Sequence, residues 1–177
     1  MVLSRRYTLL ACIGVFASVG AAAQSLAAPN VVPITSLLVT SGQPSAQALA
    51  TLGQLGFQAV IYLAPSSVPD AVKNEPELLS GQGIEFVHIP IPFGSPDESH
   101  VLAVSTALER LKTRKVLVHC QVNMRASSMV FLHRVIRGGE DPAVAYEAVA
   151  KVWSPSGAWR KLLTAQLAKH KVNFEPY

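Results

Sequence analysis

Short hydrophobic runs alternate with longer amphipathic segments along most of this chain. Runs bounded by turn residues are typical of buried strands, and such runs span residues 37–40, 58–63, 84–89 and 115–119. Segments with helical spacing and capping residues span residues 45–55, 71–80, 95–112, 125–138, 142–153 and 157–170. Alternating strands and helices require crossover connections, so the pattern predicts an α/β fold. We expect a mainly parallel central sheet of about four strands, flanked by helices, with a helical C-terminal third covering one face.

Two helix starts carry recognisable capping signals. Ser45 follows a turn and is expected to cap a helix that runs through Leu55 and stops at Gly56. The sequence Ser95-Pro96-Asp97-Glu98 reads as a capping box with proline in the first helical position.

The N-terminal segment has the pattern of a secretory signal peptide. Arg5 and Arg6 precede an apolar run from Leu9 to Ala23, and small residues offer cleavage sites at 21–23 and 25–27. A membrane anchor is the alternative, but the run is shorter than the roughly 20 residues that a span requires. We therefore expect a signal peptide over residues 1–27 and one α/β domain over residues 28–177. The protein would then be exported, to the periplasm in a bacterium, with no stable membrane anchor after cleavage.

Composition narrows the function classes. Half of the 177 residues are hydrophobic and 15% are charged, which fits one globular domain. Without Arg5 and Arg6 the chain keeps 13 basic and 11 acidic residues, and it has no basic cluster with interleaved aromatics, so we expect no nucleic-acid partner. No His/Cys/Asp spacing matches a metal site, and no cofactor is expected. The mature chain keeps one cysteine, Cys120, which is either buried and inert or reactive.

The residues around Cys120 favour a reactive cysteine over an inert, buried one. A hydrophobic strand ends at His119, Cys120 follows, and Arg125 opens an apolar helix. Ligands of α/β sheets bind at the carboxyl ends of strands, and the amides of such a loop join those of the helix N-terminus in a cradle for a tetrahedral anion. The same positive end favours thiolate over thiol, and a guanidinium can hold two phosphate oxygens. Cys120 and Arg125 can therefore face one bound anion.

The segment His119-Cys120-x4-Arg125 resembles the His-Cys-x5-Arg loop of the cysteine-based protein tyrosine and dual-specificity phosphatases. It is most similar to bacterial phosphatase-like domains, found alone or joined to β-lactamase-fold hydrolases, which also tend to carry a Cys-x4-Arg loop. The likeness covers roughly residues 38–138. Upstream it includes Ser41-Gly42-Gln43-Pro44-Ser45 and the runs 56–61 and 83–90.

This resemblance implies a phosphoric monoester hydrolase that acts on a phosphorylated protein or a small-molecule phosphate ester. Cys120 would attack phosphorus and form a thiophosphoryl intermediate, while His119 orients the loop and helps to keep the thiol ionised. Asp97 would protonate the leaving oxygen, with Glu98 as the second candidate. The substrate would be bound by the loop and its arginine, namely Gln121, Val122, Asn123, Met124 and Arg125.

The sequence also departs from the phosphatase pattern. Its loop is one residue shorter than usual and has no glycine, although Asn123 could adopt a left-handed conformation. Asp97 lies in the first turn of a predicted helix, where the helix dipole favours carboxylate over acid. Two other functions stay open at this stage: a rhodanese-like sulfurtransferase, which also uses a Cys-x4 loop, and a non-catalytic phosphate-binding or anion-binding domain.

Overall fold

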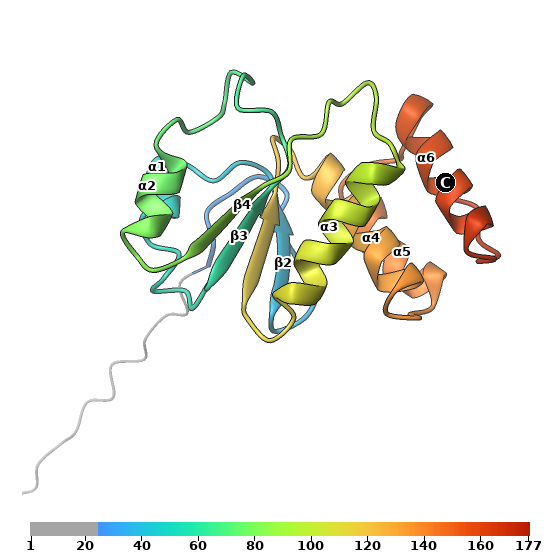
Figure 1. Ribbon diagram of the computed structural model, residues 1–177, viewed down its shortest axis with the longest axis horizontal. Helices are drawn as coiled ribbons and strands as arrows, with labels where there is room; N and C mark the ends of the chain where they lie inside the picture. The colour runs from blue at the N-terminus through green and yellow to red at the C-terminus, as the bar shows by residue number, and fades with distance from the viewer. Residues whose placement is uncertain (1–24) are drawn as a thin grey trace, which may run out of the picture.

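The computed structural model describes residues 25–177, which form one five-stranded sheet with helices on both faces (Figure 1). The strand order is β1-β2-β5-β3-β4, and all neighbours are parallel except β1 and β2. The strands span Val32–Pro33 (β1), Leu38–Ser41 (β2), Ala59–Tyr62 (β3), Glu85–His88 (β4) and Val116–His119 (β5). The predicted mainly parallel α/β fold is confirmed, with β5 in the centre of the sheet.

Strand β1 was not predicted. It has only two residues and one of them is Pro33, so neither length nor alternation distinguishes it from an extended lead-in. Its antiparallel pairing with β2 adds an edge to the four predicted strands. Most of the predicted signal peptide, residues 1–24, lies outside the described residues.

The register of the three central strands brings their carboxyl ends together. His119, the last residue of β5, is paired with Ser41 of β2 on one side and with Tyr62 of β3 on the other. The segments that follow these strands therefore start from the same edge of the sheet. This edge is where the loop after β5 lies.

Helices cover the two faces unequally (Figure 1). The short helices α1 and α2 pack against each other on one face, and α2 also contacts β4. Helix α4 contacts β2 and β5 on the other face, and α3, α5 and α6 pack against α4. The helices span Ala46–Leu49 (α1), Glu75–Ser80 (α2), Glu98–Arg110 (α3), Met124–Ile136 (α4), Pro142–Ala150 (α5) and Gly157–Lys169 (α6).

Several predicted helix boundaries are wrong. Helix α2 begins at Glu75 instead of residue 71, and α5 ends at Ala150 instead of residue 153. Helix α1 begins after Ser45 as expected but ends at Leu49, because Thr51 and Gly53 are weak helix formers and the chain continues in turns to Gly56. Another correction concerns α3, whose N-cap is Asp97 and not Ser95. Its capping box joins Asp97 to His100, since the Asp97 carboxylate accepts from the His100 backbone N–H at 3.2 Å.

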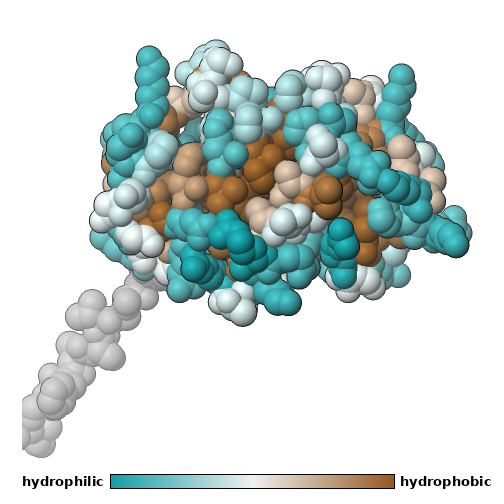
Figure 2. Space-filling view, viewed as in Figure 1, coloured by the Kyte–Doolittle hydropathy of each residue, from teal (hydrophilic) through white to brown (hydrophobic). Residues whose placement is uncertain are grey.

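The exposed edge at β4 is screened by charge. Figure 2 shows hydrophobic residues in the middle of the face viewed in Figure 1, with hydrophilic residues around them. Glu85, the first residue of β4, forms ion pairs with Arg110 at 2.5 Å and Arg114 at 2.8 Å. Charged side chains at an edge strand discourage pairing with another chain.

Among residues 25–177, no helix is long and apolar enough to cross a membrane.

Candidate active site

Cys120 lies at the carboxyl edge of the sheet, directly after the central strand. Its side chain has no exposed surface, and its thiol forms no disulfide. Its backbone N–H donates to the Ser41 carbonyl at 3.3 Å, and the preceding His119 carbonyl accepts from the Leu63 N–H at 2.8 Å. The backbone at Cys120 is therefore fixed by the strands on both sides.

The loop after Cys120 closes without glycine because Asn123 adopts the left-handed conformation, with φ of 71°. Asparagine tolerates this region better than most residues. The buried Asn123 amide donates to the Asn30 carbonyl at 2.7 Å and to the Thr40 hydroxyl at 3.0 Å. These two bonds hold the side chain that replaces glycine, and they come from segments more than 80 residues earlier in the chain.

The loop presents free donors at the start of α4. Within the described part of the chain, the backbone N–H groups of residues 121, 122, 124 and 125 donate no hydrogen bond. They lie at the N-terminus of a 13-residue helix, where free amides and the helix dipole favour an anion. The arrangement can therefore receive the oxygens of a bound phosphate.

The turn after β2 packs against the backbone of this loop. Gly42 pairs with Val122 in a short antiparallel bridge, and the Gln43 N–H donates to the Gln121 carbonyl at 2.9 Å. A Cβ on Gly42 would lie 2.7 Å from that carbonyl oxygen, closer than real Cβ contacts allow. Position 42 of the Ser-Gly-Gln-Pro motif therefore requires glycine, because the Gln121 backbone lies too close for a side chain.

Arg125 is almost fully buried, with 4% of its surface exposed. Its Nε donates to the Ile91 carbonyl at 2.9 Å, and one terminal nitrogen donates to the Gln121 side-chain oxygen at 3.4 Å. Its guanidinium carbon lies 5.1 Å from the centre of the Phe93 ring, a cation–π contact. These contacts orient the guanidinium and leave further terminal N–H donors for an anion.

Trp159 of α6 and Trp153, between α5 and α6, contact the segment that covers Arg125. The Trp159 indole donates to the Phe93 carbonyl at 2.9 Å, and the Phe93 ring lies 5.9 Å from the Trp153 ring and 5.8 Å from the Trp159 ring. The two tryptophans therefore fix the loop after β4 against α4.

Asp97 and Glu98 are exposed, and each has a lowered pKa. For Asp97, the hydrogen bond from the Ser99 hydroxyl lowers the pKa most, followed by the bond from the His100 backbone. For Glu98, the ion pair with Lys169 lowers the pKa. Both carboxyl groups thus favour the ionised form, which has no proton to donate.

Another carboxylate, Asp70, contacts the loop directly. Its Oδ1 accepts from the Gln121 side-chain amide at 2.8 Å, and the same Gln121 side chain accepts from Arg125. Asp70 was missed from the sequence, where the Pro/Ser-rich segment after β3 gave no sign that it approaches Gln121 across 51 positions. The Asp70 carboxylate is the one nearest along this hydrogen-bonded path to Arg125.

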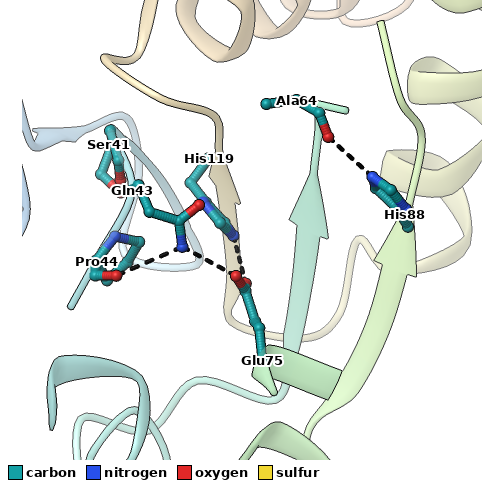
Figure 3. Close-up of polar contacts among 8 residues, drawn as sticks. Ser41, Gln43, Pro44, Ala64, Glu75, His88 and His119 are labelled. Atoms are coloured by element: carbon teal, nitrogen blue, oxygen red, sulfur yellow. Dashed lines mark hydrogen bonds and ion pairs between the residues drawn. The ribbon is translucent and has the colours of Figure 1, made fainter. Parts of the chain in front are cut away.

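His119 turns away from the loop into a buried polar network (Figure 3). Its Nε2 lies 2.7 Å from the Glu75 carboxylate, and its ring stacks on Tyr62 with centroids 4.7 Å apart. Burial, followed by the nearby Glu75, Asp70 and Cys120, raises the pKa of Tyr62 to about 12. Glu75, on α2, was also missed from the sequence.

Within residues 25–177, no group of three or more His, Cys, Asp or Glu side chains is placed to hold a metal ion.

Comparison with known proteins identifies a family of phosphatases. The family model for the DSP-PTPase phosphatase fused to NAD+ kinase matches residues 13–163. A candidate phosphatase of the DUF442 family from Shewanella putrefaciens CN-32 is 30% identical, with a TM-score of 0.74 over 81% of this chain and 95% of that chain. Comparison with curated protein sequences gives no match.

More distant solved structures share the fold. Tk-PTP in its active form is 20% identical, with a TM-score of 0.63 over 82% of this chain and 99% of that one. TpbA of P. aeruginosa is 21% identical, with a TM-score of 0.55 over 78% of this chain and 91% of that one.

The family match defines the class, a cysteine-dependent phosphatase, and the distant solved structures share its fold. The chain belongs to the family of dual-specificity-type protein tyrosine phosphatases described by that family model, which covers most of its length. The resemblance inferred from the sequence is confirmed at the level of family and fold.

Proposed function

We propose that the protein hydrolyses phosphate monoesters through a covalent intermediate on Cys120, using the shortened Cys-x4-Arg loop. One observation carries this proposal: Cys120 follows the central strand, Arg125 is buried at the start of α4, and the backbone N–H groups of residues 121, 122 and 124 have no acceptor among residues 25–177. A nucleophile, a guanidinium fork and an amide cradle on six consecutive residues fit one tetrahedral dianion.

The proposed reaction has two displacements. In the first, the Cys120 thiolate attacks phosphorus, an S–P bond forms, the P–O ester bond breaks, and an acid protonates the leaving oxygen. In the second, water attacks phosphorus and loses a proton to the same group, the S–P bond breaks, and thiolate and inorganic phosphate are released. Arg125 and the loop amides stabilise the equatorial oxygens in both steps.

The substrate is proposed to be a phosphorylated protein or a small-molecule phosphate ester. TpbA, which shares the fold, has been solved in complex with phosphotyrosine. An aryl phosphate is therefore the first substrate to test on this chain.

The proposal is tested by assaying the protein without residues 1–27 against p-nitrophenyl phosphate, and against thiosulfate with cyanide. We expect phosphate release and no thiocyanate. Thiocyanate without phosphate release would identify a sulfurtransferase instead. Binding of inorganic phosphate with neither activity would indicate an anion-binding domain.

The general acid proposed from the resemblance is Asp97, with Glu98 second. The lowered pKa of both carboxyl groups argues against them, and the contact of Asp70 with Gln121 adds Asp70 as a competitor. An acid matters most for poor leaving groups, so the asparagine variant of the true acid should slow hydrolysis of an alkyl phosphate by about 10²-fold or more. The same variant should change p-nitrophenyl phosphate hydrolysis only slightly, because p-nitrophenolate leaves without a proton.

Steady-state rates of Asp97→Asn, Glu98→Gln and Asp70→Asn on both substrates make this comparison. Asn retains the cap of α3, so Asp97→Asn should stay folded. An equal effect of Asp97→Asn on the two substrates would remove Asp97 as the acid. A selective effect of Asp70→Asn would assign the proton to Asp70.

Export is proposed from the predicted signal peptide at residues 1–27. Expressed in a bacterium, the full-length chain should appear in the periplasmic fraction with a new N-terminus between about residues 24 and 29. N-terminal sequencing of that fraction checks this. Recovery of the intact chain with Met1 only from the cytoplasm would contradict it.

A further inference from the structure

A buried carboxylate lies behind the proposed nucleophile. Glu75, the first residue of α2, is 2% exposed, and its two oxygens have different partners. Oε1 lies 2.7 Å from His119 Nε2, and Oε2 accepts from the Gln43 side-chain amide at 2.9 Å. Figure 3 shows the three side chains converging from the turn after β2, from the start of α2 and from the end of β5. We call Gln43, Glu75 and His119 the Glu75 network.

Packing alone does not account for a glutamate at this position. A carboxylate removed from water loses solvation that only paired charges and hydrogen bonds restore, and an apolar side chain of similar size is often as stable. Neither partner of Glu75 among the described residues is Lys or Arg. The N-terminus of α2 offsets part of the cost but would do so equally for an exposed acid. The role of the carboxylate therefore lies in the groups that it holds in place.

Glu75 orients the His119 ring through the contact of Oε1 with Nε2 at 2.7 Å. An ionised carboxylate can only accept, so in that form of Glu75 the shared hydrogen bond has its proton on His119 Nε2. His119 Nδ1 has no partner within the described part of the chain, so Glu75 supplies the only hydrogen bond to this ring there. The ring also stacks on Tyr62 with centroids 4.7 Å apart, a contact that orients the ring plane without selecting which nitrogen faces a partner.

The network reaches both neighbours of Cys120 in the sequence. His119 precedes the cysteine, and its ring is held by Glu75. Gln121 follows the cysteine, and its carbonyl is held by the backbone N–H of Gln43, whose side chain binds the other Glu75 oxygen. A displacement of Glu75 would therefore shift the residues on both sides of the nucleophile.

We propose that Glu75 is a positioning residue for the phosphatase reaction: with Gln43, it holds His119 and Gln121 so that the Cys120 thiolate meets the phosphorus held by the loop. This inference rests on the proposed function. Glu75 makes no contact with substrate. It acts through His119, as outer groups orient the ligands of metal sites and the bases of other enzymes.

The central variant is Glu75→Gln, which keeps the shape but puts an NH₂ group against one of the two donors. With p-nitrophenyl phosphate we expect kcat to fall by about 10–100-fold, the usual effect of removing such a supporting group. KM should change by less than about threefold, because Arg125 and the loop amides still bind the phosphate. Glu77→Gln, an exposed glutamate two positions along the same helix, is the matched control and should leave both constants unchanged.

A double-variant cycle separates positioning from general stability. If Glu75 acts through His119, then Glu75→Gln combined with His119→Asn should be no slower than His119→Asn alone. Independent structural damage would instead multiply the two losses. Gln43→Met removes one bond to Glu75 and keeps the other, so we expect a smaller loss of kcat than for Glu75→Gln.

Each outcome decides the inference. Glu75→Gln with an unchanged melting temperature and kcat within twofold of wild type would overturn it, as would multiplying losses in the cycle. If Glu75→Gln does not fold, Gln43→Met decides, and an unaltered kcat in that variant would overturn the inference. If the wild type releases no phosphate from any ester, the proposed function fails. The rate of Cys120 alkylation by iodoacetate then decides: a fall of about tenfold in Gln43→Met supports the network, and no change overturns it.

Discussion

Replacing Cys120 by serine is expected to abolish turnover while leaving the fold and phosphate binding in place. A serine hydroxyl keeps its proton at neutral pH and is a far weaker nucleophile than a cysteine thiolate. The loss of kcat on p-nitrophenyl phosphate should be on the order of 10⁴-fold or more, as for the nucleophiles of other covalent mechanisms. The substitution is nearly isosteric in a fully buried site, so the melting temperature should change little.

The control for Cys120→Ser is ligand binding. Inorganic phosphate should raise the melting temperature of the variant as it does for wild type, because Arg125 and the amides are intact. Undiminished phosphate release by Cys120→Ser would refute the covalent mechanism. Loss of both turnover and phosphate binding would show that the loop had collapsed, and Cys120→Ala would then be compared.

Arg125→Lys is expected to be the second most damaging change. A lysine supplies a point charge in place of the planar fork, and it also loses the Nε bond to Ile91 and the stacked contact with Phe93. Loss of about 2–4 kcal/mol of transition-state stabilisation is typical for one such donor. This loss corresponds to a fall of about 10²–10³-fold in kcat/KM.

The matched control for Arg125→Lys is Arg137→Lys, an exposed arginine at the other end of α4. Its kcat/KM should equal that of wild type. If Arg125→Lys keeps more than about a third of wild-type kcat/KM, bidentate phosphate binding by Arg125 is wrong.

The parts of the structure that depend on neighbouring residues in sequence could be predicted. The strands β2 to β5 lie within about one residue of the hydrophobic runs, because central parallel strands are apolar on both faces. Cys120 and Arg125 were found together because they belong to one continuous strand–loop–helix segment. The left-handed conformation anticipated for Asn123 is present in the structure.

The parts that depend on long-range contacts could not be predicted. Glu75 is 44 positions from His119 and 32 positions from Gln43, and in the sequence it looks like an ordinary acid at a helix start. Asp70 likewise reaches Gln121 only through the tertiary fold. The helix boundary at Asp97 was missed because Ser95 and Asp97 both satisfy a capping pattern, and only the bonds to His100 distinguish them.

The central claim is that the phosphoryl group of the substrate is transferred to the sulfur of Cys120. The most direct test mixes the protein with p-nitrophenyl phosphate, stops the reaction with acid within milliseconds, and measures the peptide that contains Cys120 by mass spectrometry. A phosphoryl group should be found on Cys120 during turnover, at a level that rises when Asp97→Asn or Asp70→Asn slows the second step. Rapid phosphate release with no phosphoryl group on Cys120 at any time would contradict the account.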